Sequence, residues 1–228
     1  MISALIVGNL VILDRQSAAR IRVEPKLRQY CRAVRVKFPP KQLFFRAFKD
    51  EMTVEVWGGS SSNASLKLIK KYPILAASGT AGPKRQRGDK QVPEGWYYVN
   101  RFNPSSLFHL SLGINYPNRS DLTRAINNDP GDDIFIHGNR VSMGCMAMGD
   151  PAIEEIYTLA KMSTNRVFVF VLPSRLRPAG QENSALYDQI YAINRSFNAS
   201  HRMPSVSMDG NGYYKVKDLI SLARRGSR

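Results

Sequence analysis

The sequence predicts a mixed α/β fold that is mainly β, with helices flanking a sheet. Three observations carry this prediction. Residues 43–48 and 52–57 follow the period of two that is typical of strands. Residues 166–172 form a continuous apolar run, as in a strand buried on both faces. Apolar residues within 153–160 recur at helical spacing, and therefore indicate a helix that packs on the sheet.

Composition limits the class of protein and its partners. The chain has 228 residues, enough for one core or for one core with a small helical appendage. Lys and Arg number 33 against 18 Asp and Glu, a net charge of +15, which favours anionic partners. Nucleic acid and an anionic cell-wall or membrane surface are the candidates. Because no recognition helix, zinc finger or aromatic RNA-binding signature accompanies the charge, we expect no nucleic-acid partner.

Residues 1–40 are predicted to form an N-terminal apolar segment followed by a basic helix. The first thirteen residues are apolar apart from Ser3 and Asn9, and are too few to cross a bilayer as a helix. They resemble the apolar part of a signal peptide, although a basic start is missing and Asp14-Arg15 intervene. An export signal and a simple apolar element both remain open. The helix is expected over 24–36, with Pro25 in its first turn.

Residues 41–176 are predicted to form the main domain, which contains the candidate chemistry described below. Its first hairpin, 43–57, is expected to bury one face, that of Met52, Val54 and Val56. Further elements follow the same composition and periodicity rules. They are a strand at 66–75, a basic loop at 77–92, strands at 96–99 and 108–114, a short helix at 120–128 and a strand at 134–136.

The last part of the chain reads as helical. Asp150 is expected to cap a helix that has Pro151 at its first position. Beyond the strand at 166–172, helical patterns cover 183–197 and 215–224. Residues 177–228 are therefore predicted to be a helical C-terminal extension.

One stretch, 133–145, contains the candidate chemistry. A short apolar strand delivers His137, and Cys145 follows on a turn that contains Gly138 and Gly144. A thiol attacks an acyl carbon as its thiolate, and a nearby imidazole lowers the thiol pKa. The carbonyl of Gly138 can accept from one ring nitrogen. The amides of Gly144 and Cys145 can together form an oxyanion hole.

Other interpretations of these residues stay open on spacing alone. Cys145 and His137 can be a buried structural cysteine and a packed core histidine. A zinc site from Cys145, His137 and His109 is weak, because no C-x-x-C or H-E-x-x-H spacing is present. No metal or cofactor is expected. Cys31 is read as an ordinary helix residue.

The stretch resembles the catalytic segment of the YkuD-type L,D-transpeptidases. Because the loop between its His and Cys is short, it most resembles the YafK-like branch of that family. The resemblance covers about residues 43–173. It rests on the pattern of 137–150, His-Gly-Asn-x-Val-Ser-x-Gly-Cys followed by Met and Asp, and on two upstream segments. These are Gly82-Pro83-Lys84 with Gly88-Asp89 and 93–97, and 108–112 with 115–118.

The resemblance implies a curved, sandwich-like β-sheet core and acyl transfer on peptidoglycan stem peptides. Cys145 would attack an L,D-peptide bond involving diaminopimelate and form a thioester, and His137 would protonate the leaving amine. Transfer to an amine gives transpeptidation; transfer to water gives a carboxypeptidase, or an amidase that frees a wall-linked protein. The substrate implies export to the periplasm or cell envelope. The alternative is a catalytically idle, basic wall-binding or nucleic-acid-binding protein.

Five residues are predicted to bind substrate: His109, Ser142, Asn139, Arg140 and Lys84. For Lys84 the competing interpretation is a solvated basic loop, and for His109 a packed, hydrogen-bonded strand residue. The chain departs from most relatives in its short loop between His137 and Cys145 and in Ala147, where they carry Arg or Asn. Because Ala147 cannot orient a second stem peptide, we expect hydrolysis or protein release to outweigh cross-linking.

Overall fold

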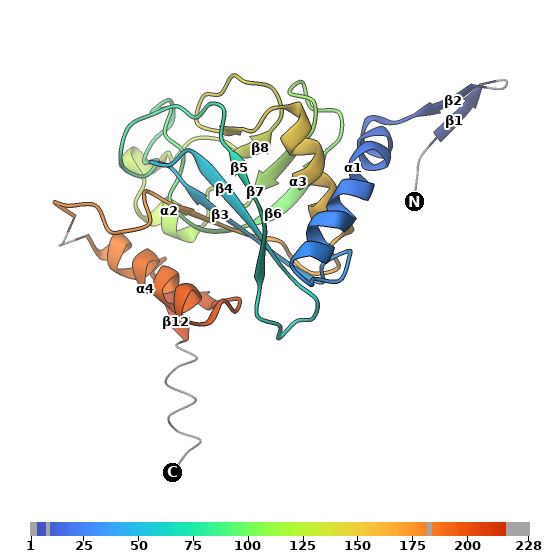
Figure 1. Cartoon of the computed structure of the whole chain (residues 1–228). Coiled ribbons are helices and arrows are strands. Elements are labelled where there is room, and N and C mark those ends of the chain that lie inside the picture. Colours follow the sequence, from blue (N-terminus) through green and yellow to red (C-terminus); the bar gives the residue numbers. More distant parts are fainter. Residues whose placement is uncertain (1–3, 8–9, 182–183, 218–228) are drawn as a thin grey trace, which may run out of the picture.

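A curled sheet of eight strands forms the centre of the fold (Figure 1). The computed structural model describes residues 4–7, 10–181 and 184–217. The strand order is β5-β4-β3-β10-β6-β7-β8-β9. The bounds are β3 Gln42–Phe48, β4 Thr53–Gly59, β5 Lys67–Pro73, β6 Gly95–Asn103, β7 Ser111–Ile114, β8 Phe135–His137, β9 Met146–Ala147 and β10 Phe168–Leu172.

The two edges of this sheet meet. Just after β5, the amide of Leu75 donates to the carbonyl of Ala147 on β9, at 2.8 Å, and Ala76 pairs with Ala147 in an antiparallel bridge. The sheet therefore closes on itself at this point. The predicted curved sheet and the mixed, mainly β class are confirmed.

Strand β10 lies in the middle of the sheet, parallel to β3 and antiparallel to β6. Its residues from Val169 to Leu172 are buried. The continuous apolar run predicted a strand with both faces covered, and this prediction is confirmed.

Helices cover both faces of the sheet. Helices α1 (Arg15–Ala33) and α3 (Asp150–Met162) pack against each other, and α4 (Ala185–Ser200) lies on the opposite side (Figure 1). Because side chains alternate along a strand, Phe45 joins the core under α1 and α3, whereas Phe44 joins the core under α4. The prediction that the first hairpin buries one face is wrong: Glu55 and Trp57 are buried as well as Val54 and Val56, because α4 covers the second face.

Smaller elements complete the described chain. They are the hairpin β1 (Ala4–Val7) and β2 (Leu10–Leu13), helix α2 (Arg119–Thr123), the 3-10 turn Ile126–Asn128, and the hairpin β11 (Ser205–Met208) and β12 (Tyr214–Lys217). Within the described chain, we find no helix with the length and hydropathy needed to cross a bilayer.

Three predicted helices differ from the structure. The one predicted at 120–128 is the shorter helix α2 followed by a separate 3-10 turn. Helix α1 begins at Arg15 rather than 24, because the Asp14 carboxylate caps it by accepting from the Ser17 amide at 2.7 Å, and Pro25 lies inside the helix. Residues 215–217, predicted to start a helix over 215–224, belong instead to strand β12, which pairs with β11. The remainder of that predicted helix, 218–224, lies outside the described residues. The division of the chain at 40 and 176 stays a prediction.

A buried ion-pair network ties α4 to the sheet. The Arg46 guanidinium donates to Glu55 Oε2 at 2.8 Å and to the side-chain oxygens of Asn194 and Asn198 on α4. Burial alone would raise the pKa of Glu55, but hydrogen bonds from Arg175 and the charge of Arg46 lower it to about 2. The carboxylate is therefore held ionised between the sheet and the C-terminal helix.

Replacing one member of this network is expected to destabilise the protein strongly. Arg46→Met leaves the Glu55 charge and two amide oxygens buried without this donor, at a cost of about 3–5 kcal/mol in the free energy of unfolding. Urea denaturation followed by circular dichroism measures it. The control is Arg28→Ala, which removes an exposed pair with Glu24 and should cost about 0–1 kcal/mol. Equal losses in the two variants would contradict the role of the network.

Candidate active site

His137 and Cys145 are brought together by the parallel pairing of β8 with β9. In this register Ile136 lies opposite Met146 and His137 opposite Ala147. One step earlier, the Phe135 amide donates to Cys145 Sγ at 3.4 Å. Both side chains line one cleft of 230 Å³, with Phe108 and Ser111 among its other walls. Within the described residues, no hydrogen bond joins the thiol to the imidazole.

The ring of His137 is buried and held in one orientation. Its Nδ1 lies 2.6 Å from the carbonyl oxygen of Gly138, and the ring of Phe108 packs on it with centroids 4.7 Å apart. Because a carbonyl only accepts, Nδ1 carries the proton and Nε2 is left free to accept one. Burial lowers the pKa of His137, and the bond to Gly138 partly offsets this. The neutral imidazole is therefore the favoured form near neutral pH.

Position 138 requires glycine. A Cβ there would lie 2.6 Å from both the Asp150 carboxylate and the carbonyl oxygen of Phe108. The close approach lets the chain after His137 turn beneath the 108–109 segment. The contact of His137 with the Gly138 carbonyl, foreseen from sequence, depends on this turn.

The turn that carries Cys145 is fixed by two serine hydroxyls. Ser142 Oγ donates to the carbonyl of Cys145 at 2.6 Å, and the amide of Gly144 donates to Ser78 Oγ at 2.7 Å. The Ser78 hydroxyl in turn donates a hydrogen bond to the Lys90 carbonyl at 2.7 Å. The expected oxyanion hole with free amides at Gly144 and Cys145 is therefore not what the structure shows, because the Gly144 amide already has a partner. Ser142, predicted to bind substrate, holds the turn instead.

The thiol of Cys145 is not activated by the imidazole in this arrangement. Burial raises its pKa, while the Phe135 amide and the charge of Lys84 act in the opposite direction. The largest effect is burial, so the thiol is favoured over the thiolate near neutral pH. A substrate that brings His137 Nε2 and Sγ together would be needed to change this balance.

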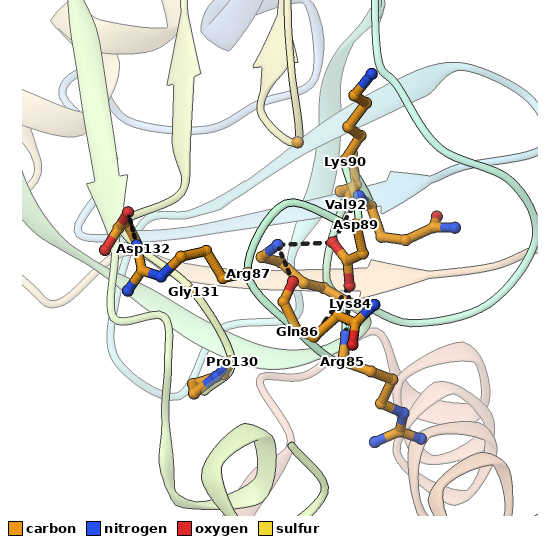
Figure 2. Close-up of polar contacts among 12 residues, drawn as sticks. Lys84, Arg85, Gln86, Arg87, Asp89, Lys90, Val92, Pro130, Gly131 and Asp132 are labelled. Atoms are coloured by element: carbon orange, nitrogen blue, oxygen red, sulfur yellow. Dashed lines mark hydrogen bonds and ion pairs between the residues drawn. The ribbon is translucent and has the colours of Figure 1, made fainter. Parts of the chain in front are cut away.

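Lys84 acts by its charge rather than as a free ligand. Its ammonium is buried and donates to Asp89 Oδ1 at 2.7 Å and to the Gln86 carbonyl at 2.9 Å, as Figure 2 shows. An ion pair between Arg87 and Asp132 ties the same loop to the segment 129–132, as Figure 2 also shows. Because Asp89 already pairs with the Lys84 ammonium, this geometry does not favour binding of a substrate carboxylate by Lys84, which stays a prediction.

His109 faces away from the cleft. It precedes β7 in a turn with a φ of 69°, not in the predicted strand, and its Nε2 lies 2.8 Å from Glu154 Oε1 on α3. Its neighbour Phe108 lines the cleft instead. His109 therefore braces its turn against α3 and does not line the cleft, in contrast to the prediction that it binds substrate.

Asn139 and Arg140 lie at a different hollow. Together with Leu75 and the start of α3 they line a separate cleft of 520 Å³. The amide of Asn139 donates to Asp150 Oδ1 at 2.7 Å, so the Asp150 carboxylate holds this loop. The prediction that Asp150 caps its own helix is wrong, because the helix has no side-chain cap. Neither Asn139 nor Arg140 lines the cleft of Cys145.

Sequence reasoning missed two residues that shape the cleft. Ser78 lies in a loop of small residues with no distinguishing pattern, and it reaches Gly144 across 66 positions of sequence. Phe108 enters the sequence prediction only as part of the segment 108–112. Its position directly before His109 is the available signal.

Comparison with known proteins identifies the family. The family model YkuD, the L,D-transpeptidase catalytic domain, matches residues 57–169, which include both His137 and Cys145. The chain belongs to the YkuD family. The predicted YafK-like resemblance is also confirmed. The L,D-transpeptidase candidate YafK of Escherichia coli K12 is 28% identical over 191 residues, which cover 78% of this chain and 75% of that protein.

Solved structures show weaker similarity. The helical cell shape determining protein Pgp2 from Campylobacter jejuni, as its K307A mutant, aligns with a TM-score of 0.49 and 18% identity, over 76% of this chain and 61% of that one. L,D-transpeptidase 1 of Mycobacterium tuberculosis aligns with a TM-score of 0.32 and 14% identity, over 57% of this chain and 62% of that one. The alignments span about three-fifths of these two chains.

The electrostatics of Cys145 predict its alkylation profile. Because burial raises the thiol pKa, the rate with iodoacetamide should still be rising above pH 9, the ordinary value for a thiol. Lys84→Gln removes a charge that lowers this pKa, so the profile should move to higher pH. The control is Lys90→Gln, an exposed lysine of the same loop that has no such effect. A Lys84→Gln profile that moved to lower pH, or did not move, would contradict the assigned role.

Proposed function

We propose that this chain is a peptidoglycan-acting acyltransferase in which Cys145 is the nucleophile and His137 the general base and acid. Membership of the YkuD family supports an enzyme of this class. The observation that carries the proposal for these residues is that Cys145 and an oriented His137, whose Nδ1 is bound to the Gly138 carbonyl, line one cleft. The proposed substrate is the stem peptide.

In the first step His137 Nε2 takes the proton of the Cys145 thiol. The sulfur attacks the carbonyl carbon of the scissile amide, a C–S bond forms, and the C–N bond breaks as His137 returns the proton to the leaving amine. In the second step an amine or a water molecule attacks the thioester, and the C–S bond breaks to regenerate the thiol. Of the two amides predicted to form the oxyanion hole, that of Cys145 is the remaining candidate donor, because the Gly144 amide donates to Ser78.

Location and partners follow from the substrate. Stem peptides lie outside the cytoplasmic membrane, so the proposed site of action is the periplasm or cell envelope. A net charge of +15 supports proximity to an anionic envelope surface. A wall-linked protein is a further proposed substrate, released when the leaving amine belongs to that protein.

Cys145→Ala is expected to abolish turnover of purified muropeptides without loss of fold, since no other group in the cleft can form the thioester. His137→Gln should lower turnover by at least ~10²-fold, the usual effect of losing a general base. Mass spectrometry of the products measures both. Near-normal turnover by the Cys145→Ala protein would show that another group is the nucleophile, whereas a wild-type protein without turnover would favour the idle binding protein.

The choice of acceptor is expected to favour water. Ala147 is fully buried, and its backbone amide and carbonyl both pair with the 75–76 segment, so position 147 offers no polar group to an incoming stem peptide. Transfer to an amine needs orientation that hydrolysis does not. The measurement is a time course with tetrapeptide muropeptide and excess acceptor stem. Faster accumulation of cross-linked dimer than of hydrolysed tripeptide would show that the preference is for transpeptidation.

A further inference from the structure

The turn that places Phe108 over His137 is held in part by helix α1, which lies outside the 57–169 match to the family. Residues Ser106, Leu107 and Phe108 form one wall of the Cys145 cleft. The next residue, His109, has a φ of 69°, a left-handed conformation that is unfavourable for a residue other than glycine. A turn with such a residue persists when surrounding contacts determine it. Those contacts come from α1 and α3.

Arg15, the first residue of α1, provides the main contact. Its Nη1 donates to the carbonyl of Ser106 at 2.7 Å and to the carbonyl of His109 at 2.5 Å. One nitrogen therefore spans both ends of the turn that carries Leu107 and Phe108. Charge-assisted bonds of this kind are about twice as strong as neutral ones, so the pair of contacts is well suited to fix the turn.

A second link from α1 acts on the side chain of the same turn. His109 Nε2 lies 2.8 Å from Glu154 Oε1 on α3, and Arg22 of α1 donates to that carboxylate. Arg22 is half-exposed, whereas Glu154 is nearly buried. Arg15 thus holds the backbone of the turn. Glu154 holds the side chain of His109, and Arg22 holds Glu154.

The held turn shapes the surroundings of the imidazole. The Phe108 ring packs on the His137 ring with centroids 4.7 Å apart, although Phe108 is 39% exposed and Leu107 is 95% exposed. Two exposed apolar side chains have little reason to stay folded over the cleft without an external contact. If the turn were released, water would reach His137 and the thiol beside it.

We propose that Arg15 is a positioning residue of the cleft: by holding the Ser106 and His109 carbonyls it keeps Phe108 against His137. The N-terminal helix, which lies outside the 57–169 match to the family, is thereby part of the working site. The consequence for turnover rests on the proposed function. The consequence for the environment of His137 and Cys145 does not.

The test compares Arg15→Ala and Arg15→Lys with Arg20→Ala, a control on the same helix whose arginine pairs with Glu24 away from the cleft. Three quantities are measured on the full chain. They are the titration midpoint of the His137 ring by NMR, assigned with His137→Gln, the rate of Cys145 alkylation by iodoacetamide, and muropeptide turnover. Thermal unfolding is followed for each variant.

Arg15→Ala should raise the His137 midpoint towards its ordinary value, because burial is what lowers that pKa. The titratable side chain that shares the cleft is Cys145, and Asp150 lies behind Gly138. Alkylation of Cys145 should become faster, and turnover should fall roughly tenfold through misplacement of the reacting groups. Arg15→Lys should show smaller changes of the same sign, and Arg20→Ala none.

Phe108→Ala tests the same link without touching α1. It should reproduce the shift in the His137 midpoint, and the double variant with Arg15→Ala should add little, since both changes remove one contact. The proposal is overturned if folded Arg15→Ala or Arg15→Lys matches Arg20→Ala in midpoint and alkylation, or if the Arg15→Ala and Phe108→Ala effects add in full. A wild-type chain without muropeptide turnover would refute the proposed function, while the midpoint and alkylation data would still decide the role of Arg15.

Discussion

The parallel pairing of β8 with β9 is the constraint on which the site depends. Parallel neighbours in a sheet normally need a crossover of a dozen or more residues. Here the chain returns within residues 138–145 and forms no helix. It does so through Asn139 and Gly144, which have φ values of 62° and 83°. Their amides donate to Asp150 and Ser78, and these bonds hold the two ends of the loop. Cys145 and His137 share a cleft because this short return is possible.

Sequence reasoning succeeded where contacts are local. The strand before His137, the contact of its ring with the adjacent Gly138 carbonyl and the helix after Pro151 all depend on neighbours in the chain. The buried central strand was also predictable, because an apolar run of that length needs cover on both faces.

It failed where the deciding partner is distant. Lys84, His109 and Arg140 are of types that bind carboxylates, and their positions in family motifs gave no sign of other partners. His109 meets Glu154 and Gly144 meets Ser78 across 45 and 66 positions of sequence. Lys84 has its partner, Asp89, only five positions away, but a pairing of Lys with Asp in a loop is equally consistent with solvation. A single sequence contains no information that ranks these pairings.

The burial of Cys31 determines how selectively Cys145 can be labelled. Cys31 lies on α1 in the core between α1 and the sheet, with no exposed surface, and burial raises its pKa to about 11. It is a free thiol that reagents in water reach only when the fold opens. In the native protein a thiol-reactive dye should therefore report on Cys145 alone, with a stoichiometry of about one label per chain. Under denaturant, the appearance of a second label gives a direct readout of unfolding, so one reagent separates the accessibility of the nucleophile from the integrity of the core.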